Sequence, residues 1–381
     1  MKDNTLIFET LKQDVQTRAR TGVLHLEHGP VQTPVFMPVG TNGTVKAVHH
    51  SDLKGMGIQL ILANTYHLYL RPGIEVIKKA GGLHTLTNWK GNYLTDSGGY
   101  QVFSLAPFRK ITPEGIKFRS HIDGSYHFLT PEDVVDLQCG FGSDIMMPLD
   151  VCTSPGITYR KALEALETTK EWAKRSILHR SQKEAEIYGL LFGIIQGNFF
   201  EDLRKRSADD IIGLDFPGIA IGGLSVGEPF QEFVHYLSYT AELLPSEKPR
   251  YVMGIGTPEY ILEAVENGID LFDCVFPTRI ARNGSVFTRK GIIPLKKSRY
   301  AAQIEPIDTQ CGCPVCKHYT RAYLRHLFKA GEILGPMLAT LHNLFFMEHF
   351  VRDIRESISV GAFTEFKNKF LAEYTYGNSD T

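Results

Sequence analysis

The strongest constraint on the fold of this chain is a repeated alternation of two kinds of segment. Short apolar runs rich in β-branched residues alternate with longer stretches that have the apolar period of a helix. This order predicts parallel strands joined by helical crossovers. Eight apolar runs can be counted, at residues 33–41, 59–66, 92–96, 144–150, 191–197, 218–224, 251–256 and 271–277. Eight strand–helix units predict an α/β protein whose strands close into a (β/α)8 TIM barrel.

Several segments lie outside or between these runs. Crossover helices are predicted at residues 159–182, 200–212, 229–244 and 258–267. Thr257 is suited to cap the last of them, with Pro258 at its first helical position. Residues 8–30 are predicted to form strands that cap one end of the barrel, and residues 100–130 an insertion after the third strand. We interpret residues 1–381 as a single catalytic barrel domain, with the largest insertion at residues 285–345 and a final helix near residues 344–356.

Polar residues end several of the apolar runs. The third run ends at Asp96, the fourth at Asp150, the fifth near Gln196 and the eighth contains Asp273. In barrels of this kind the chemistry takes place at the carboxyl ends of the strands. Each residue alone could serve a turn, but buried carboxylates are costly unless they are paired or used. Two carboxylates facing one pocket can support displacement at a sugar carbon, because one attacks the anomeric centre while the other handles the proton of the leaving group.

A third acid and an amide indicate what this pocket binds. An ionised Asp150 only accepts hydrogen bonds, which matches the N1–H and exocyclic amine edge of a guanine, and Gln196 can donate to its carbonyl oxygen. Glycines at 222 and 223 would let backbone amides approach the edge of a flat ligand. Faces for stacking against such a ring are offered by Tyr100 and Met253. The pocket is therefore predicted to hold a purine-like base.

The cysteines predict a metal site. Three of the six fall within one short window, Cys311-Gly-Cys313-Pro-Val-Cys316, which is the spacing of metal ligands and not of a disulfide scaffold. A structural tetrahedral zinc site needs a fourth ligand. The candidates are His318, His326, His342 and His349. We favour His342, because it opens the predicted last helix and would tie that helix to the insertion, whereas His318 lies too close to Cys316. No ligand position is left free, so the metal is predicted to be structural.

Charge is distributed unevenly along the chain. The formal net charge is −1, yet between Cys274 and Gly331 eleven Lys and Arg stand against two acids, a net of +9 that leaves −10 for the rest. Such a segment can be a solvated basic surface. It can also hold a polyanion such as RNA, and the metal ligands inside it favour this second interpretation.

The chain shows no targeting or membrane signal. Residues 1–4 lead into no apolar signal core, and no apolar run is long enough to cross a membrane. A cytoplasmic location is the expected default.

Five motifs are long and jointly specific. They are Thr95–Ser104 (TDSGGYQVFS), Ile221–Glu228 (IGGLSVGE), Tyr251–Gly256 (YVMGIG), Phe272–Arg279 (FDCVFPTR) and the zinc motif. Together they resemble those of the bacterial tRNA-guanine transglycosylases, also called queuine tRNA-ribosyltransferases, over nearly the whole chain. The resemblance implies a pentosyltransferase of queuosine biosynthesis that exchanges guanine at the wobble position of certain tRNA anticodons for 7-aminomethyl-7-deazaguanine. It implies no ATP or organic cofactor, and a homodimer in which one subunit helps position the tRNA of the other.

The resemblance also implies residue roles. Asp273 looks like the nucleophile that holds the RNA covalently, and Asp96 looks like the acid/base, so that two displacements retain the configuration. The implied base-binding residues are Tyr100, Asp150, Cys152, Gln196, Gly222, Gly223, Leu224, Met253 and Gly254. The implied RNA-contacting residues are Gly254, Gly256, Glu259, Tyr260, Thr278, Arg279 and Arg282. The implied ligands of one structural Zn²⁺ per subunit are Cys311, Cys313, Cys316 and His342.

Two positions bear on substrate choice and RNA contact. Val226 and Cys152 resemble the bacterial form of the family, whereas the eukaryotic form, which takes the bulkier queuine, has glycine in place of Val226. Ala281 departs from the family pattern, in which glycine is common, and its methyl group is expected to shift Arg282 slightly.

Two rival functions are compatible with parts of the pattern. A barrel glycoside hydrolase would also use two carboxylates, but it explains neither the zinc motif nor the basic segment, and only Trp89 and Trp172 are present as sugar platforms. A catalytically silent RNA-binding relative would be expected to have lost an acid, yet Asp96 and Asp273 are both present.

Overall fold

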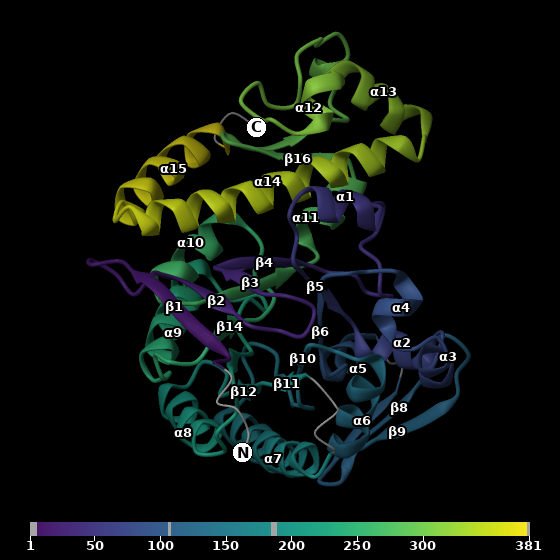
Figure 1. Ribbon diagram of the computed structural model, residues 1–381, viewed down its shortest axis with the longest axis vertical. Coiled ribbons are helices and arrows are strands. Elements are labelled where there is room, and N and C mark those ends of the chain that lie inside the picture. Colours follow the sequence, from purple (N-terminus) through teal and green to yellow (C-terminus); the bar gives the residue numbers. More distant parts are fainter. Residues whose placement is uncertain (1–5, 106–107, 184–188, 379–381) are drawn as a thin grey trace.

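A computed structural model describes residues 6–105, 108–183 and 189–378, and it contains the predicted barrel (Figure 1). Residues 1–4, on which the signal-peptide argument relied, lie outside the described part. The barrel strands are β4 (Val35–Pro38), β5 (Leu60–Ala63), β6 (Asn92–Thr95), β10 (Ile145–Met146), β11 (Leu190–Leu191) continued as β12 (Gly193–Ile195), β13 (Ile219–Ile221), β14 (Arg250–Val252) and β15 (Leu271–Cys274). Each of the eight predicted apolar runs overlaps one of them, and β11 and β14 each begin one residue before their run.

The strands close on themselves in parallel pairing. β15 pairs with β4, with Asp273 opposite Met37, and a parallel bridge between Val39 and Leu62 joins β4 to β5. The remaining neighbours follow chain order in two sheets, β5-β6-β10-β11 and β12-β13-β14-β15. The prediction of a (β/α)8 barrel is confirmed.

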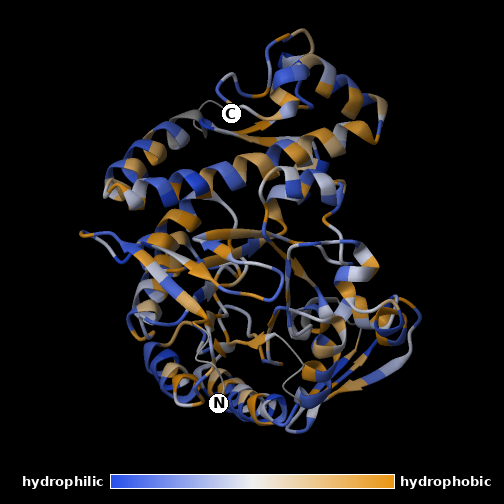
Figure 2. Ribbon diagram, viewed as in Figure 1, coloured by the Kyte–Doolittle hydropathy of each residue, from blue (hydrophilic) through white to orange (hydrophobic). Residues whose placement is uncertain are grey.

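Both faces of the barrel strands are buried. In β5, Leu60 and Leu62 belong to the apolar cluster inside the barrel, while Ile61 and Ala63 belong to the cluster between strands and helices. Strands buried on both faces read as continuous apolar runs, which is why the runs lack a polar alternation. Hydrophobic residues accordingly dominate the strands, while the outer helices mix hydrophobic and hydrophilic residues (Figure 2).

The crossover helices surround the strands. The four predicted helices are α7 (Tyr159–Ser181), α8 (Glu201–Ile212), α9 (Phe230–Glu242) and α10 (Pro258–Glu266), each within a few residues of its prediction. Further helices are α1 (His50–Gly55), α2 (Thr65–Leu70), α3 (Ile74–Lys79), α4 (Leu83–Thr87) and α6 (Pro131–Phe141). Among the described residues, no helix combines the length and apolar character needed to span a membrane.

A three-stranded antiparallel sheet covers the end of the barrel at which the strands begin. It consists of β1 (Phe8–Gln13), β2 (Arg20–Leu24) and β3 (Val31–Thr33), in that order. The prediction that residues 8–30 form capping strands is confirmed. We call this end of the barrel the base.

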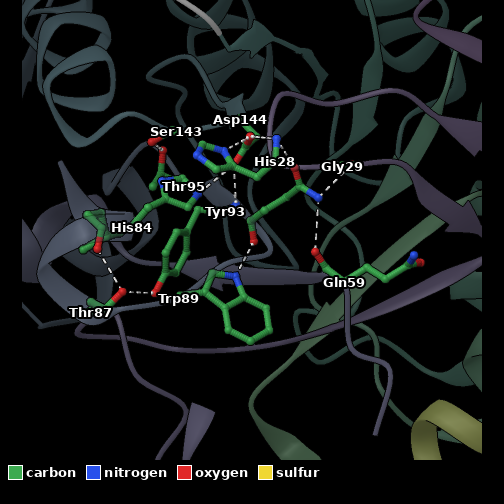
Figure 3. A network of polar contacts seen from close by, with 12 residues as sticks. His28, Gly29, Gln59, His84, Thr87, Trp89, Tyr93, Thr95, Ser143 and Asp144 are labelled. Carbon is green, nitrogen blue, oxygen red and sulfur yellow. Dashed lines mark hydrogen bonds and ion pairs between the residues drawn. The ribbon is translucent and has the colours of Figure 1, made fainter. Parts of the chain in front are cut away.

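Two buried aspartates at the base, Asp144 and Asp270, bind side chains from the segment of the capping sheet. Asp144, which precedes β10, accepts a hydrogen bond from the Tyr93 backbone N–H at 2.7 Å and contacts His28 Nδ1 at 2.7 Å and His84 Nε2 at 3.1 Å. Figure 3 shows both histidine rings directed at Asp144, and the two rings stack with their centroids 3.6 Å apart.

Asp270, which precedes β15, has an equally complete set of partners. Arg20 of β2 donates to both of its oxygens, at 2.9 and 2.6 Å, and the Arg250 backbone N–H donates at 2.7 Å. The Asp270 side chain is fully buried and that of Arg20 is 5% exposed. Because an unpaired buried charge is costly, this pair fixes the capping sheet to the barrel.

The predicted insertion after the third strand is present as a second antiparallel sheet. After α5 (Gly99–Leu105), the strands β7 (Arg109–Thr112), β8 (Gly115–Arg119) and β9 (Tyr126–Leu129) pair in chain order. Ile116, Phe118 and Leu129 point into the main apolar cluster. The sheet therefore packs one face on the barrel wall.

The C-terminal region differs from its prediction. After α11 (Phe276–Arg282) come β16 (Ser285–Thr288), β17 (Gly291–Pro294), the 3₁₀ helix η1 (Ser298–Tyr300), α12 (Pro314–His318), α13 (Arg321–Ala330), α14 (Leu334–Ser359) and α15 (Phe363–Asn378). A helix over residues 344–356 is present as part of α14, but the predictions that His342 opens it and that it is the final helix are wrong, because α14 begins earlier and α15 follows it. Pro336 lies in the first turn of α14, where its missing N–H is tolerated, so the helix starts at Leu334 and His342 lies in its interior.

The insertion has an apolar cluster of its own, which includes Val286, Leu295, Val315 and Leu324. In Figure 1, α14 runs between this region and the barrel. Ala281 of α11 is fully buried in the same cluster, so its methyl group packs in the apolar space between α11 and the insertion. That residues 285–345 form an insertion within a single domain stays a prediction.

Candidate active site and metal cluster

A cavity of about 590 Å³ opens at the carboxyl ends of the barrel strands. This volume suits a ligand of the size of a nucleoside. The cavity is lined by the following predicted residues: Asp96, Tyr100, Asp150, Cys152, Gln196, Gly222, Gly223, Leu224, Met253, Gly254, Asp273, Thr278, Arg279 and Arg282. The structure thus brings together side chains that are distant in sequence, because parallel strands end at one rim.

Asp273, near the end of β15, is held through one of its two oxygens. Oδ1 accepts hydrogen bonds from the Tyr251 hydroxyl at 2.5 Å and from the Gly254 backbone N–H at 2.9 Å. Among the described residues no donor contacts Oδ2. Burial raises the pKa of Asp273, while these two hydrogen bonds oppose the rise by favouring the carboxylate. One oxygen is therefore fixed and the other is left for a ligand.

Asp96 follows β6 and is more deeply buried, at 8% exposed. Its carboxylate accepts hydrogen bonds from the Asn64 side-chain amide, from Thr65 N–H at 2.9 Å and from Gly98 N–H at 3.2 Å. Burial, aided by the neighbouring charge of Asp273, nevertheless raises the pKa of Asp96 to about 6. A carboxyl group with this pKa can both give and take a proton near neutral pH.

Asp150 and Gln196 form a connected pair on the cavity wall. Gln196 Nε2 donates to Asp150 Oδ2 at 2.7 Å, and Ser97 Oγ donates to Oδ1 at 3.2 Å. Burial raises the pKa of Asp150, and these hydrogen bonds oppose the rise. The Gln196 amide carries a second N–H, so it can hold Asp150 and still donate to a carbonyl oxygen of a ligand.

The two glycines after β13 lie so close to the Gln196 amide that a side chain on either would displace it. A Cβ on Gly222 would lie 2.6 Å from Gln196 Nε2, and a Cβ on Gly223, whose φ is +69°, would lie 2.5 Å from Gln196 Oε1. Arg204, fully buried on α8, lies behind them and donates to the Asn198 carbonyl at 2.7 Å. It also approaches the carbonyls of both glycines at 3.4 to 3.5 Å. These contacts support the backbone of the two glycines from behind.

The remaining wall is less polar. Tyr100 on α5 is 53% exposed at the mouth, and Met253 lies across the cavity at the end of β14. Burial, with Asp150 as neighbour, raises the pKa of Cys152 to about 12, which keeps it a neutral thiol. Val226 also lines the cavity, and its backbone N–H donates to Glu228 at 2.8 Å.

The predicted RNA-contacting residues fall into two groups. Arg279 and Arg282 reach the mouth from α11. Gly256 is buried, with no room for a side chain because a Cβ there would lie 2.2 Å from that of Cys274. Tyr260 packs its ring against Phe233, with centroids 4.6 Å apart. Gly256, Glu259 and Tyr260 form the second group, and none of the three lines the cavity.

The four predicted metal ligands lie together in the insertion. Cys311, Cys313, Cys316 and His342 place four potential ligand atoms within 4.8 Å of one another. The three sulfurs lie 3.9, 3.4 and 3.4 Å from His342 Nδ1, close to the edge of about 3.5 Å expected between ligands of a tetrahedral zinc. Of the four candidate histidines, it is His342 that completes the cluster.

The second shell of this cluster favours metal binding too. His342 Nε2 lies 2.7 Å from the Phe287 carbonyl oxygen, which requires a proton on Nε2 and leaves Nδ1 free to face the sulfurs. Cys313 caps α12, where its sulfur accepts a hydrogen bond from Cys316 N–H at 3.2 Å. The residues present therefore fit a structural zinc site that joins α12, α14 and the β16–β17 hairpin.

Sequence reasoning missed the residues that support the carboxylates. Tyr251 and Asn64 donate to Asp273 and Asp96 respectively, and Arg204 supports the glycines. Tyr251 occupies an inward-facing position of an apolar run, where its hydroxyl was the only available signal. Asn64 lies within the second run and directly follows β5, and that position at the rim could have identified it.

Fold and cavity together define a (β/α)8-barrel enzyme with buried carboxylates at its mouth and a separate Cys₃His cluster. The sequence matches the family model described as queuine tRNA-ribosyltransferase over residues 14–376. A queuine tRNA-ribosyltransferase of Treponema denticola is 57% identical over 374 residues, which cover 98% of this chain and 99% of the relative. Proteins with the same description from Borrelia hermsii and Caldanaerobacter subterraneus are each 52% identical, over 98% of this chain and 99% and 98% of the relatives.

The chain therefore belongs to the queuine tRNA-ribosyltransferase family. The family expected from the motifs is confirmed, and with it the interpretation as an enzyme of the glycosyltransferase class. The rival interpretation as a barrel glycoside hydrolase is rejected.

Proposed function

We propose that the protein replaces guanine at the wobble position of a tRNA anticodon with 7-aminomethyl-7-deazaguanine, by double displacement through a covalent aspartyl-ribose intermediate. The observation that carries this proposal is the unequal setting of Asp96 and Asp273 in one cavity. Asp96 has three donors and a pKa raised to about 6, whereas Asp273 has both of its donors on Oδ1. Two carboxylates with different tasks need such different surroundings.

In the first displacement, Asp273 Oδ2 attacks the anomeric carbon C1′ of the nucleotide. The bond between C1′ and the guanine N9 breaks, and the electron pair of that bond goes to the departing base, to which Asp96 gives a proton. Tyr251 and Gly254 hold Oδ1 meanwhile and keep the nucleophile oriented. The ribose is left esterified to Asp273, which preserves the energy of the glycosidic bond without any cofactor.

The second displacement runs in reverse with a different base. Asp96, now ionised, removes the proton from N9 of the incoming base, and that nitrogen attacks C1′ while Asp273 leaves as a carboxylate. Inversion at each step retains the original configuration. A single acid/base serves both steps because its pKa of about 6 lies close to neutral pH.

The purine ring is proposed to lie between Tyr100 and Met253. Asp150 accepts hydrogen bonds from its N1–H and amino group, and Gln196 and the Gly223 backbone bind its carbonyl edge. Val226 and Cys152 limit the room beside position 7, which favours an aminomethyl group over the larger substituent of queuine.

RNA is proposed to dock against Arg279, Arg282 and the rest of the basic segment from Cys274 to Gly331.

A structural zinc ion on the Cys₃His cluster would hold this segment beside Asp273, and it would supply no chemistry to the reaction. Elemental analysis of purified protein is expected to give about one zinc per chain, and Cys316→Ser to lose it. A folded, metal-free wild type would overturn this assignment. The proposal includes a homodimer, which sedimentation velocity can test.

The exchange itself can be measured directly. Purified protein should incorporate radiolabelled guanine into tRNA that carries a wobble guanine, and unlabelled 7-aminomethyl-7-deazaguanine should displace the label more effectively than queuine does. Absence of incorporation would favour the silent RNA-binding relative instead. Preference for queuine would leave the exchange reaction intact and overturn the choice of base.

A further inference from the structure

The sheet β7-β8-β9 presents to solvent a face that the proposed chemistry does not use. Lys117 pairs with Lys110 on one side and with Phe128 on the other, and Arg119 pairs with Tyr126. Directly opposed residues of antiparallel strands share one face. Phe108, just before β7, adds its ring 6.1 Å from that of Tyr126. We define the outer sheet face as Phe108, Lys110, Lys117, Arg119, Tyr126 and Phe128.

The two faces of this sheet are unlike each other in burial. Ile116, Phe118 and Leu129 on the inner face are at most 5% exposed. On the outer face, Tyr126 is 64%, Phe128 45% and Phe108 44% exposed. A half-buried antiparallel sheet normally carries polar residues on its solvent side. Three exposed aromatic rings gathered on one face therefore indicate a binding surface.

The composition of the outer sheet face favours one kind of partner. It combines three cations with three aromatic rings and contains no acid. Lys117 Nζ and Arg119 Cζ lie 5.7 and 5.9 Å from the centre of the Tyr126 ring. Glu114 and Asp123, the acids of this segment, lie in the two turns, where Asp123 binds Ser125 at 2.7 Å. Cations that meet phosphates, interleaved with rings that stack on bases, form a surface typical of RNA binding.

The location of this sheet connects it to the cavity. His121, in the β8–β9 turn, bonds Tyr66 of α2 at 2.7 Å, and its ring lies 5.8 Å from that of His67. His67 in turn lines the cavity. One end of the sheet thus reaches the mouth, away from the barrel strand β15 that leads into the basic segment. RNA that leaves the mouth on this side would pass over the outer sheet face.

We propose that the outer sheet face is a second RNA-docking surface, which binds the backbone and stacks against bases of the same tRNA whose wobble nucleotide occupies the cavity. This inference rests on the proposed function, because that function makes a long polyanion the substrate of the cavity. The charge of this sheet is complementary to that of RNA, because residues 108–129 carry four Lys and Arg against two acids. The rest of the protein outside the Cys274–Gly331 segment is acidic.

The test removes charge from this face without touching the cavity. In Lys117→Ala/Arg119→Ala, the KM for tRNA should rise roughly tenfold, and the slope of log affinity against log salt should fall by about two, because two phosphate contacts are lost. The kcat and the KM for the free base should not change. Tyr126→Ala/Phe128→Ala should also raise the KM for tRNA while leaving the salt slope unchanged, since stacking involves no net charge.

A matched control removes the same number of charges elsewhere on the barrel wall. Lys161 and Lys205 are exposed on α7 and α8, and Lys161→Ala/Lys205→Ala should bind tRNA like the wild type. If the sheet variant also binds like this control, the inference is overturned. It is equally overturned if the sheet variant changes the sedimentation of the protein and not its RNA affinity, because the face would then join copies of the chain. Failure of the wild type to exchange guanine would instead count against the proposed function, and direct tRNA binding by the variants would still be readable.

Discussion

Asp144 and Asp270 at the base of the barrel and Asp273 at its mouth are carboxylates of the same kind, but they are held in different ways. At the base, both oxygens of Asp144 have partners, including two histidine rings (Figure 3). Both oxygens of Asp270 accept hydrogen bonds from Arg20. At the mouth, the two donors to Asp273 share Oδ1. Saturated carboxylates at the base stabilise the fold, whereas an incompletely satisfied one at the mouth is available to react. Residue type alone does not separate Asp273 from the two aspartates at the base, but their hydrogen-bond partners do.

The largest expected effect is a loss of activity, without a loss of stability, when the carboxylate at the mouth is replaced. Asp273→Asn should reduce guanine exchange by about 10⁴-fold or more, because the covalent route is lost. Its urea unfolding midpoint should match the wild type or exceed it, since a partly satisfied, half-buried charge has been removed. A large loss of stability in this variant would mean that the mouth, like the base, is built for the fold.

A substitution at the base should lower the stability of the protein and leave its activity unchanged. Asp270→Ala leaves Arg20 buried without its partner and should lower the free energy of unfolding by about 3–5 kcal/mol. The kcat of the folded fraction should remain that of the wild type, measured at a temperature well below the unfolding transition. A loss of turnover in fully folded Asp270→Ala would contradict the assignment of the base to stability.

Asp96 is expected to make stability depend on pH. Its pKa is raised from 3.8 to about 6 in the folded protein, so the folded state binds the proton more tightly than the unfolded state. The stability from this group is fully present below pH of about 4 and is lost as the pH rises through about 6, a change of about 3 kcal/mol at most.

Asp96→Asn should lack this dependence, and chemical denaturation from pH 4 to 7 can compare it with the wild type. The gap between the two proteins should move in favour of the variant as the pH rises. A constant gap would show that Asp96 ionises normally. In the wild type, kcat/KM for tRNA should also fall above pH of about 6 as Asp96 loses the proton that it gives to guanine.

The smallest effect is expected within the base network. His28→Ala removes one of two rings that contact Asp144 and should lower the free energy of unfolding by about 1–2 kcal/mol. His25→Ala is a suitable control, because His25 is exposed and lies 3.9 Å from Glu9. Equal stability of the two variants would remove His28 from the forces that hold the capping sheet.

The strand order of the barrel could be predicted because it depends on local pattern. Every run of apolar, β-branched residues became a strand, and a parallel barrel places the ends of those strands at one rim. Asp96, Asp150 and Asp273 were therefore found without any knowledge of contacts. The Cys₃His cluster was equally accessible, because three of its ligands lie within one short window.

What the sequence did not yield depends on contacts between distant segments. Asp144 and Asp270 stand just before strands, a position that indicates the base, but His28, His84 and Arg20 could be assigned to them only in three dimensions. The start of α14 was missed because Gly335 and Pro336 read as a helix break. Arg204 resembled an ordinary surface arginine of an amphipathic helix, and only the fold shows it buried behind Gly222 and Gly223.

The central claim is that Asp273 forms a covalent bond to the RNA. Protein mixed with wobble-guanine tRNA in the absence of a competing base, then quenched by denaturation and digested, should yield a ribose adduct that mass spectrometry assigns to Asp273. Asp273→Asn should yield none, while Asp270→Asn should yield the normal amount. An adduct on Asp96, or robust exchange by a protein in which Asp273 is absent, would contradict the account.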